Sequence, residues 1–245
     1  MYGSLSIILI CAVSVFAAEP AMSDTKLRHA AQPQIKIAII GDSTVCNYPT
    51  DKPDRGWGMF IEEAFTPGSV TVVNLAASGR STKTFIKEGR WKKTLAEKPD
   101  IILIQFGHND SHAAERPEST NAATDYREFL EQYIDEARAA GAAPILVTPM
   151  VRRNFHADGK LNDILQPYAD AMKKVGAEKK APVIDLFTAS KALLENLGPE
   201  KAAAHANKPG DNTHFNEIGA RAMAELVLKE LPTAEPKLKT MLKAK

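Results

Sequence analysis

The fold of this chain is decided by the stretch IKIAIIGDST, residues 35–44. Its first six residues are apolar except Lys36, and an apolar run of this length predicts a buried strand. Ser43 then lies just past the end of that strand, where open parallel α/β sheets place their chemistry. Because a serine hydroxyl is a weak nucleophile until a base removes its proton, a catalytic role for Ser43 requires a base and oxyanion donors elsewhere in the chain.

Four more apolar runs predict strands, and segments with helical periodicity separate them. We expect strands at residues 35–40, 70–75, 101–106, 144–148 and 183–186. We expect helices at residues 58–65, 84–90, 124–140, 167–178, 189–197 and 217–230. Strands that alternate with helices form a parallel sheet covered on both faces. With right-handed crossovers, the predicted fold is a three-layer α/β/α sandwich with a five-stranded parallel sheet.

The first residues have the pattern of a signal peptide. Residues 5–18 are apolar apart from two serines, and Val15, Phe16 and Ala17 fit a signal-peptidase site. The run is shorter than the roughly 20 residues that a membrane-spanning helix needs. We therefore expect a signal peptide at residues 1–17, cleaved after Ala17 or, as the alternative left open, after Ala18, and we expect the protein to be secreted or periplasmic. Because no Lys or Arg precedes the apolar run, an uncleaved anchor or a buried helix is the alternative.

The rest of the sequence divides into three parts. Residues 18–34 are small and polar and predict a flexible lead, and residues 35–231 form the predicted folded domain. Residues 232–245 carry four lysines against one glutamate, and we expect this basic tail to be frayed. Only Cys46 lies outside the predicted signal, so we expect no internal disulfide and interpret Cys46 as a small packing residue rather than a nucleophile.

Composition excludes several classes of protein. With 44% hydrophobic and 25% charged residues, the chain of 245 residues matches one globular α/β domain rather than a disordered protein or a membrane channel. Its formal net charge of +1 gives no sign of a nucleic-acid partner. Once the signal is removed, we expect a monomer without stable membrane association.

Four loops carry unusual polar content. They are GDST (residues 41–44), NLAASGRST (74–82), QFGHND (105–110) and DNTH (211–214). The first three follow the first three predicted strands, so they lie at one edge of the sheet. The fourth precedes the last predicted helix.

These loops supply the groups that acyl transfer requires. Ser43 can act as nucleophile, His214 as the base that takes its proton, and Asp211 as the acid that orients the imidazole. The backbone N–H groups of Ser43 and Gly79 and the amide of Asn109 can form an oxyanion hole. Taken singly, each residue also fits a structural role as a helix cap, a turn residue or a surface histidine. Their joint occurrence, in four loops and in this order, favours catalysis.

The same four blocks resemble those of the SGNH (GDSL-like) hydrolase superfamily, because Ser43, Gly79, Asn109 and His214 match its Ser, Gly, Asn and His blocks one by one. The segments GWG (residues 56–58), NLAASGRST and QFGHND are similar to the rhamnogalacturonan acetylesterase branch. The resemblance implies a flavodoxin-like fold, the pair Asp211 and His214, and no metal or organic cofactor. It also implies removal of O-acetyl groups from an acetylated polysaccharide, most directly rhamnogalacturonan (pectin), through an acetyl-serine intermediate.

A pectic substrate carries galacturonate carboxylates, so cationic groups near the cleft would help to bind it. Candidate substrate-binding residues follow the same loops: Arg80, His108, Arg152, Arg153 and Trp57. A solvated surface charge is the competing interpretation of each arginine.

Three alternatives stay open on the residues alone. An esterase for xylan or another acetylated glycan would use the same chemistry with a different groove. A metallophosphoesterase would use Gly41-Asp42 and the GHND segment as metal motifs, but the Asp-x-His that such enzymes need is missing from the first strand end. A non-catalytic glycan-binding module would leave the pair Asp211 and His214 unexplained.

Overall fold

β1 (Ile35–Gly41) lies near the centre of a five-stranded parallel sheet in the computed structural model, which describes residues 1, 3, 34–162 and 164–244. The other strands are β2 (Val70–Asn74), β3 (Ile101–Gln105), β4 (Ala143–Val147) and β5 (Val183–Ile184). They are arranged in the order β2-β1-β3-β4-β5, which is the flavodoxin-like order. The predicted signal peptide, apart from residues 1 and 3, and the predicted lead up to residue 33 lie outside the described residues.

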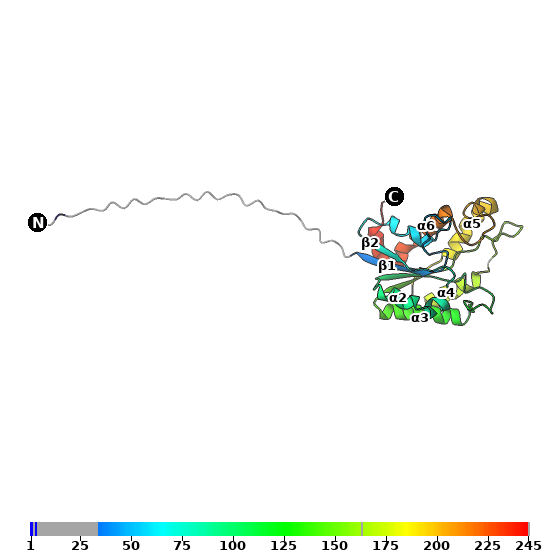
Figure 1. Cartoon of the computed structure of the whole chain (residues 1–245), viewed down its shortest axis with the longest axis horizontal. Coiled ribbons are helices and arrows are strands. Elements are labelled where there is room, and N and C mark those ends of the chain that lie inside the picture. The colour runs from blue at the N-terminus through cyan, green and yellow to red at the C-terminus, as the bar shows by residue number, and fades with distance from the viewer. Residues whose placement is uncertain (2, 4–33, 163, 245) are drawn as a thin grey trace. The chain divides into compact units, whose positions relative to one another are not determined.

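Helices cover both faces of the sheet. Figure 1 shows α2 (Arg90–Ala96), α3 (Asp125–Ala139) and α4 (Gln166–Lys179) on one face, and α5 (Leu186–Ala203) and α6 (Glu217–Ala234) on the other. The remaining elements are α1 (Thr82–Lys87) and the 3₁₀ helices η1 (Trp57–Phe60), η2 (Glu62–Ala64) and η3 (Pro236–Met241). The predicted three-layer α/β/α sandwich is confirmed.

The alternation of side chains along β1 builds the two halves of the core. Ile37 and Ile39 join the hydrophobic cluster that includes residues of η1 and α6, whereas Ala38 and Ile40 join the cluster that includes residues of α3. All four side chains are fully buried. A strand buried on both faces reads as a continuous apolar run, which explains why this stretch decides the fold.

Several boundaries differ from the predicted ones. Residues 58–65 form two short 3₁₀ helices instead of one α-helix, because Met59 N–H donates to Gly56 and Ala64 N–H donates to Ile61, each three residues back. β5 ends at Ile184, because the Asp185 side chain accepts from a backbone N–H at 3.1 Å and caps α5 there. The helix α2 was not predicted.

The C-terminal segment is the main correction to the predicted organisation. We expected a frayed tail from residue 232, but α6 continues to Ala234 and η3 follows it. Leu238 is fully buried in the same cluster as α6, which anchors this segment. Backbone hydrogen bonds join Thr66 to Met241 at 2.8 Å and Lys243 to Ala64 at 2.9 Å. The folded domain therefore extends beyond residue 231.

β2 and β5 are the two edge strands of the sheet. On β2, the backbone N–H of Val72 donates to the carboxylate of Glu62 in η2 at 2.6 Å. At the other edge, β5 has only two residues and is preceded by Pro182, which has no N–H to donate. Within the described part of the chain, no helix is both long enough and apolar enough to cross a membrane.

We expect Leu238→Ala to destabilise the domain by about 2–5 kcal/mol, since it removes a fully buried side chain and leaves a cavity. The free energy of unfolding, measured by urea denaturation, tests this. Lys239→Ala is the matched control, because Lys239 is exposed on the same 3₁₀ helix. Equal stability of the two variants would show that the C-terminal segment contributes nothing to the fold.

Candidate active site

Ser43, His214 and Asp211 form one hydrogen-bonded chain. His214 Nε2 lies 3.0 Å from Ser43 Oγ, and His214 Nδ1 lies 2.9 Å from Asp211 Oδ2. Burial raises the pKa of Asp211, but hydrogen bonds from the backbone and side chain of His214 and from Thr213 N–H outweigh it and lower the pKa to about 2. The ionised carboxylate thus accepts the Nδ1–H of His214, which leaves Nε2 able to take the Ser43 proton.

The turn that carries Ser43 is held by the buried carboxylate of Asp42. Asp42 Oδ1 accepts from the Thr44 N–H at 2.9 Å and from the Thr44 hydroxyl at 2.7 Å. Gly41 is needed at the start of this turn, because a Cβ there would lie 2.6 Å from the carbonyl oxygen of Gln105. The chain can therefore turn sharply at the end of β1 and present Ser43.

Gly79 and Asn109 line the same pocket as Ser43 and His214, which has a volume of about 260 Å³. Gly79 has a φ of 78°, and the space that its Cβ would occupy is open, so a ligand can approach the backbone closely. Asn109 Nδ2 donates to the carbonyl of Arg80 at 3.0 Å. An amide has two N–H donors, so the second is available to a bound oxyanion.

A second set of hydrogen bonds joins the loop that carries Gly79 to the loop that carries Asn109. The carboxyl group of Asp110 is fully buried and accepts from the Thr82 N–H at 3.1 Å, the Thr82 hydroxyl at 2.5 Å and the Thr120 hydroxyl at 3.0 Å. Together with the bond from Asn109 to Arg80, these contacts fix the loop after β3 against the loop after β2. The positions of Gly79 and Asn109 relative to each other depend on them.

The GDSL-like lipase/acylhydrolase family matches residues 39–222. The chain belongs to this family. It is 40% identical over 209 residues to the rhamnogalacturonan acetylesterase RhgT of Bacillus subtilis strain 168, which covers 79% of this chain and 88% of that protein. An acetylxylan esterase of Xylanibacter ruminicola is 27% identical over 220 residues, which covers 79% of this chain and 42% of that protein.

Among solved structures, the YxiM protein of Bacillus subtilis matches with a TM-score of 0.73 and 28% sequence identity. The match covers 82% of this chain and 56% of that one, so this chain spans little more than half of YxiM. This GDSL-like hydrolase is thus a carboxylic ester hydrolase on the flavodoxin-like fold, and its four polar loops meet at the carboxyl edge of the sheet.

The substrate-binding roles predicted for Trp57 and Arg153 are wrong, because both side chains are buried. Trp57 is fully buried, and its Nε1–H donates to Gln105 Oε1 at 2.7 Å, so its ring has no face left for a sugar. Gln105 in turn donates to the Thr44 hydroxyl at 2.8 Å. Trp57 therefore supports the turn that carries Ser43 through Gln105.

Arg153 is also buried, and its guanidinium donates to the carbonyls of Asp211 at 2.9 Å and His214 at 2.6 Å while lying 4.3 Å from the Phe215 ring centroid. Burial lowers the pKa of Arg153 to about 10. Arg153 therefore holds the loop that carries the acid and the base.

The remaining predicted binding residues differ in their access to the pocket. Arg152 and His108 line it, and Arg152 donates to the His108 carbonyl at 3.0 Å. Burial lowers the pKa of His108 despite the Asp42 carboxylate 3.3 Å away, so the neutral ring donates from Nδ1 to that carboxylate. Arg80 lies outside the residues that line the pocket and pairs with Glu88 at 3.0 Å. Their roles in binding stay predictions.

Sequence reasoning missed several residues that support the site. Tyr48 donates its hydroxyl proton to the Ser43 carbonyl at 2.8 Å, and nothing in its sequence surroundings signals this. Thr44, Gln105 and Asp110 lie inside the polar loops at strand ends, and this position could have indicated that they support the site. Across residues 34–162 and 164–244, no group of three or more His, Cys, Asp and Glu side chains is arranged to hold a metal ion. Those residues therefore lack the ligand cluster that a metallophosphoesterase would require.

Asp110 gives a prediction about stability and pH. Burial raises its pKa to about 7, and hydrogen bonds from Thr82 and Thr120 offset this only in part. In the unfolded chain the pKa of an aspartate is about 3.9. Between about pH 3.9 and pH 7 the folded protein therefore holds a proton on Asp110 that the unfolded chain has lost. The free energy of unfolding consequently decreases as the pH rises towards 7. In urea denaturation, the stability of wild type relative to Asp110→Asn should fall from pH 5 to pH 8, by up to about 1.4 kcal/mol per pH unit inside that window. A constant difference would mean that Asp110 is ionised throughout.

Proposed function

We propose that this hydrolase removes O-acetyl groups from rhamnogalacturonan through an acetyl-serine intermediate on Ser43. The observation that carries the proposal is the hydrogen-bonded chain from Asp211 through His214 to Ser43, which ends in a small pocket beside Gly79 and Asn109. The substrate rests on the 40% identity to a rhamnogalacturonan acetylesterase over most of both chains. The proposal also includes export, which is supported by the signal-like pattern of residues 1–17.

In the first half of the reaction, His214 Nε2 takes the proton of Ser43 as the serine oxygen attacks the acetyl carbonyl carbon. The negative charge that develops on the carbonyl oxygen is stabilised by N–H donors of Ser43, Gly79 and Asn109. Asp211 stays ionised and stabilises the imidazolium. His214 then returns the proton to the sugar oxygen, which leaves as an alcohol while the acetyl group stays on Ser43.

In the second half, a water molecule gives a proton to His214 and attacks the acetyl-serine carbonyl. Collapse of this intermediate releases acetate, and the proton returns from His214 to Ser43. The pocket of about 260 Å³ is small, which suits an acetyl group better than a long acyl chain.

Acetylated xylan is the second candidate substrate, favoured by the 27% identity to an acetylxylan esterase. The chemistry at Ser43 would be the same, and only the surroundings of the pocket would select the polymer.

Acetate release from acetylated rhamnogalacturonan and from acetylated xylan tests the function directly. We expect wild type to prefer rhamnogalacturonan and Ser43→Ala to release no acetate from either, since the variant lacks the nucleophile. Circular dichroism should show an intact fold in the variant. Faster acetate release from acetylated xylan would make xylan the substrate. Tight glycan binding without any turnover would instead favour a non-catalytic glycan-binding module.

The different roles of Asp211 and His214 predict different losses of kcat when each residue is replaced. We expect roughly 10⁶-fold lower kcat for His214→Ala and roughly 10⁴-fold lower kcat for Asp211→Asn, because the second variant keeps a base that is only poorly oriented. Hydrolysis of p-nitrophenyl acetate measures both. Wild-type rates in either variant would rule out this triad.

A further inference from the structure

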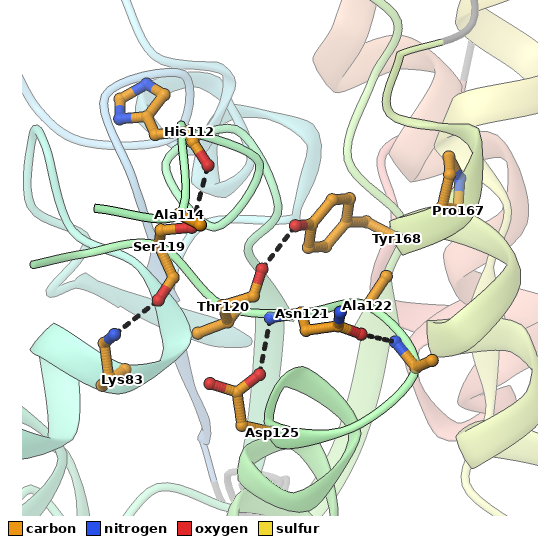
Figure 2. A pocket seen from close by; sticks show the side chains of 11 residues that line it. Lys83, His112, Ala114, Ser119, Thr120, Asn121, Ala122, Asp125, Pro167 and Tyr168 are labelled. Atoms are coloured by element: carbon orange, nitrogen blue, oxygen red, sulfur yellow. Dashed lines mark hydrogen bonds between the residues drawn. The ribbon is translucent and has the colours of Figure 1, made fainter. Parts of the chain in front are cut away.

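A second and larger pocket lies next to the catalytic one. It has a volume of about 720 Å³ and is formed by Lys83 of α1, the loop from His112 to Asp125, and Pro167 and Tyr168 at the start of α4 (Figure 2). We call this pocket the side trough. His112 lines both the side trough and the catalytic pocket, so the two pockets are neighbours.

The walls of the side trough are fixed by hydrogen bonds within the protein. Tyr168 donates to the carbonyl of Thr120 at 2.6 Å, and Asn121 N–H donates to Asp125 Oδ1 at 2.5 Å (Figure 2). On the opposite wall, Lys83 donates to the carbonyl of Ser119. A site held in this way needs little ordering when a ligand binds, which is typical of preformed ligand pockets.

The lining is polar and suits a sugar unit. Hydroxyl, amide and carbonyl groups of the loop from His112 to Asp125 can exchange hydrogen bonds with ring hydroxyls. Lys83 forms no ion pair within residues 34–162 and 164–244, and its ammonium group has three N–H donors, of which the Ser119 carbonyl uses one. Asp125 also lines the trough and accepts from the Asn121 N–H through Oδ1, so a bound uronate must place its carboxylate towards Lys83 and away from Asp125.

We propose that the side trough is a glycan subsite, which holds a sugar unit next to the acetylated one and places Lys83 against the carboxylate of a uronic acid. This rests on the proposed function, since a polysaccharide extends beyond the ester that is cleaved. Because the two pockets meet at His112, a glycan bound at the catalytic pocket can extend past this side chain into the trough. The trough therefore contributes to the selection of the polymer.

Blocking the trough tests the subsite. Ala114 is exposed and lines the trough, so Ala114→Trp fills it without removing an internal contact. We expect kcat/KM for acetylated rhamnogalacturonan oligosaccharides to fall about tenfold or more, and kcat/KM for p-nitrophenyl acetate to stay within about twofold of wild type. Ala113→Trp is the matched control, because Ala113 is exposed but does not line the trough, and it should match wild type on both substrates.

Lys83→Gln tests the charge, since glutamine keeps a donor for the Ser119 carbonyl. We expect a rise in KM of about tenfold on uronate-containing oligosaccharides and little change on neutral acetylated xylo-oligosaccharides. Equal effects on the two substrates would overturn the contact with a carboxylate.

The outcomes separate the subsite from the function. Wild-type kcat/KM of Ala114→Trp on oligosaccharides, with acetate release that still depends on Ser43, would overturn the subsite and leave the function standing. If wild type hydrolyses p-nitrophenyl acetate but releases acetate from no glycan, the function and the subsite both fall.

Discussion

The hydrogen bonds of the Asp42 carboxylate are the contact on which the site depends. Asp42 is fully buried at the end of β1, yet Thr44 and His108 lower its pKa and so hold the carboxylate ionised against the burial that raises it. One oxygen closes the turn around Ser43, and the other accepts from His108 in the loop after β3. A single side chain thus connects the turn that carries Ser43 with the loop that carries Asn109.

Two other buried ionisable side chains, Arg153 and Asp110, also hold the loops that carry the catalytic groups. Arg153 holds the loop of Asp211 and His214 through its carbonyls, and Asp110 joins the loops after β2 and β3. Burial of such groups is costly unless their hydrogen bonds are satisfied, so the protein gives up some stability to keep these loops in place. Arrangements of this kind are typical of sites that must be preorganised before substrate arrives.

The fold and the central residues of the site could be predicted because they depend on local patterns. Apolar runs define the strands, parallel strands bring their carboxyl ends together, and few residue types can act as nucleophile or base. The roles of Trp57 and Arg153 could not be predicted, because their burial depends on Gln105 and on the loop at residues 211–214, both far away in sequence. The basic C-terminal segment looked frayed by composition, although Leu238 anchors it.

The edges of the sheet have a consequence for the behaviour of the protein at high concentration. An open edge strand offers unpaired N–H and C=O groups to a strand of another molecule, which is a common route to aggregation. Here Glu62 occupies an N–H of β2, and β5 is too short to template a long pairing. Both edges therefore offer less to an added strand than a long, fully open edge strand would.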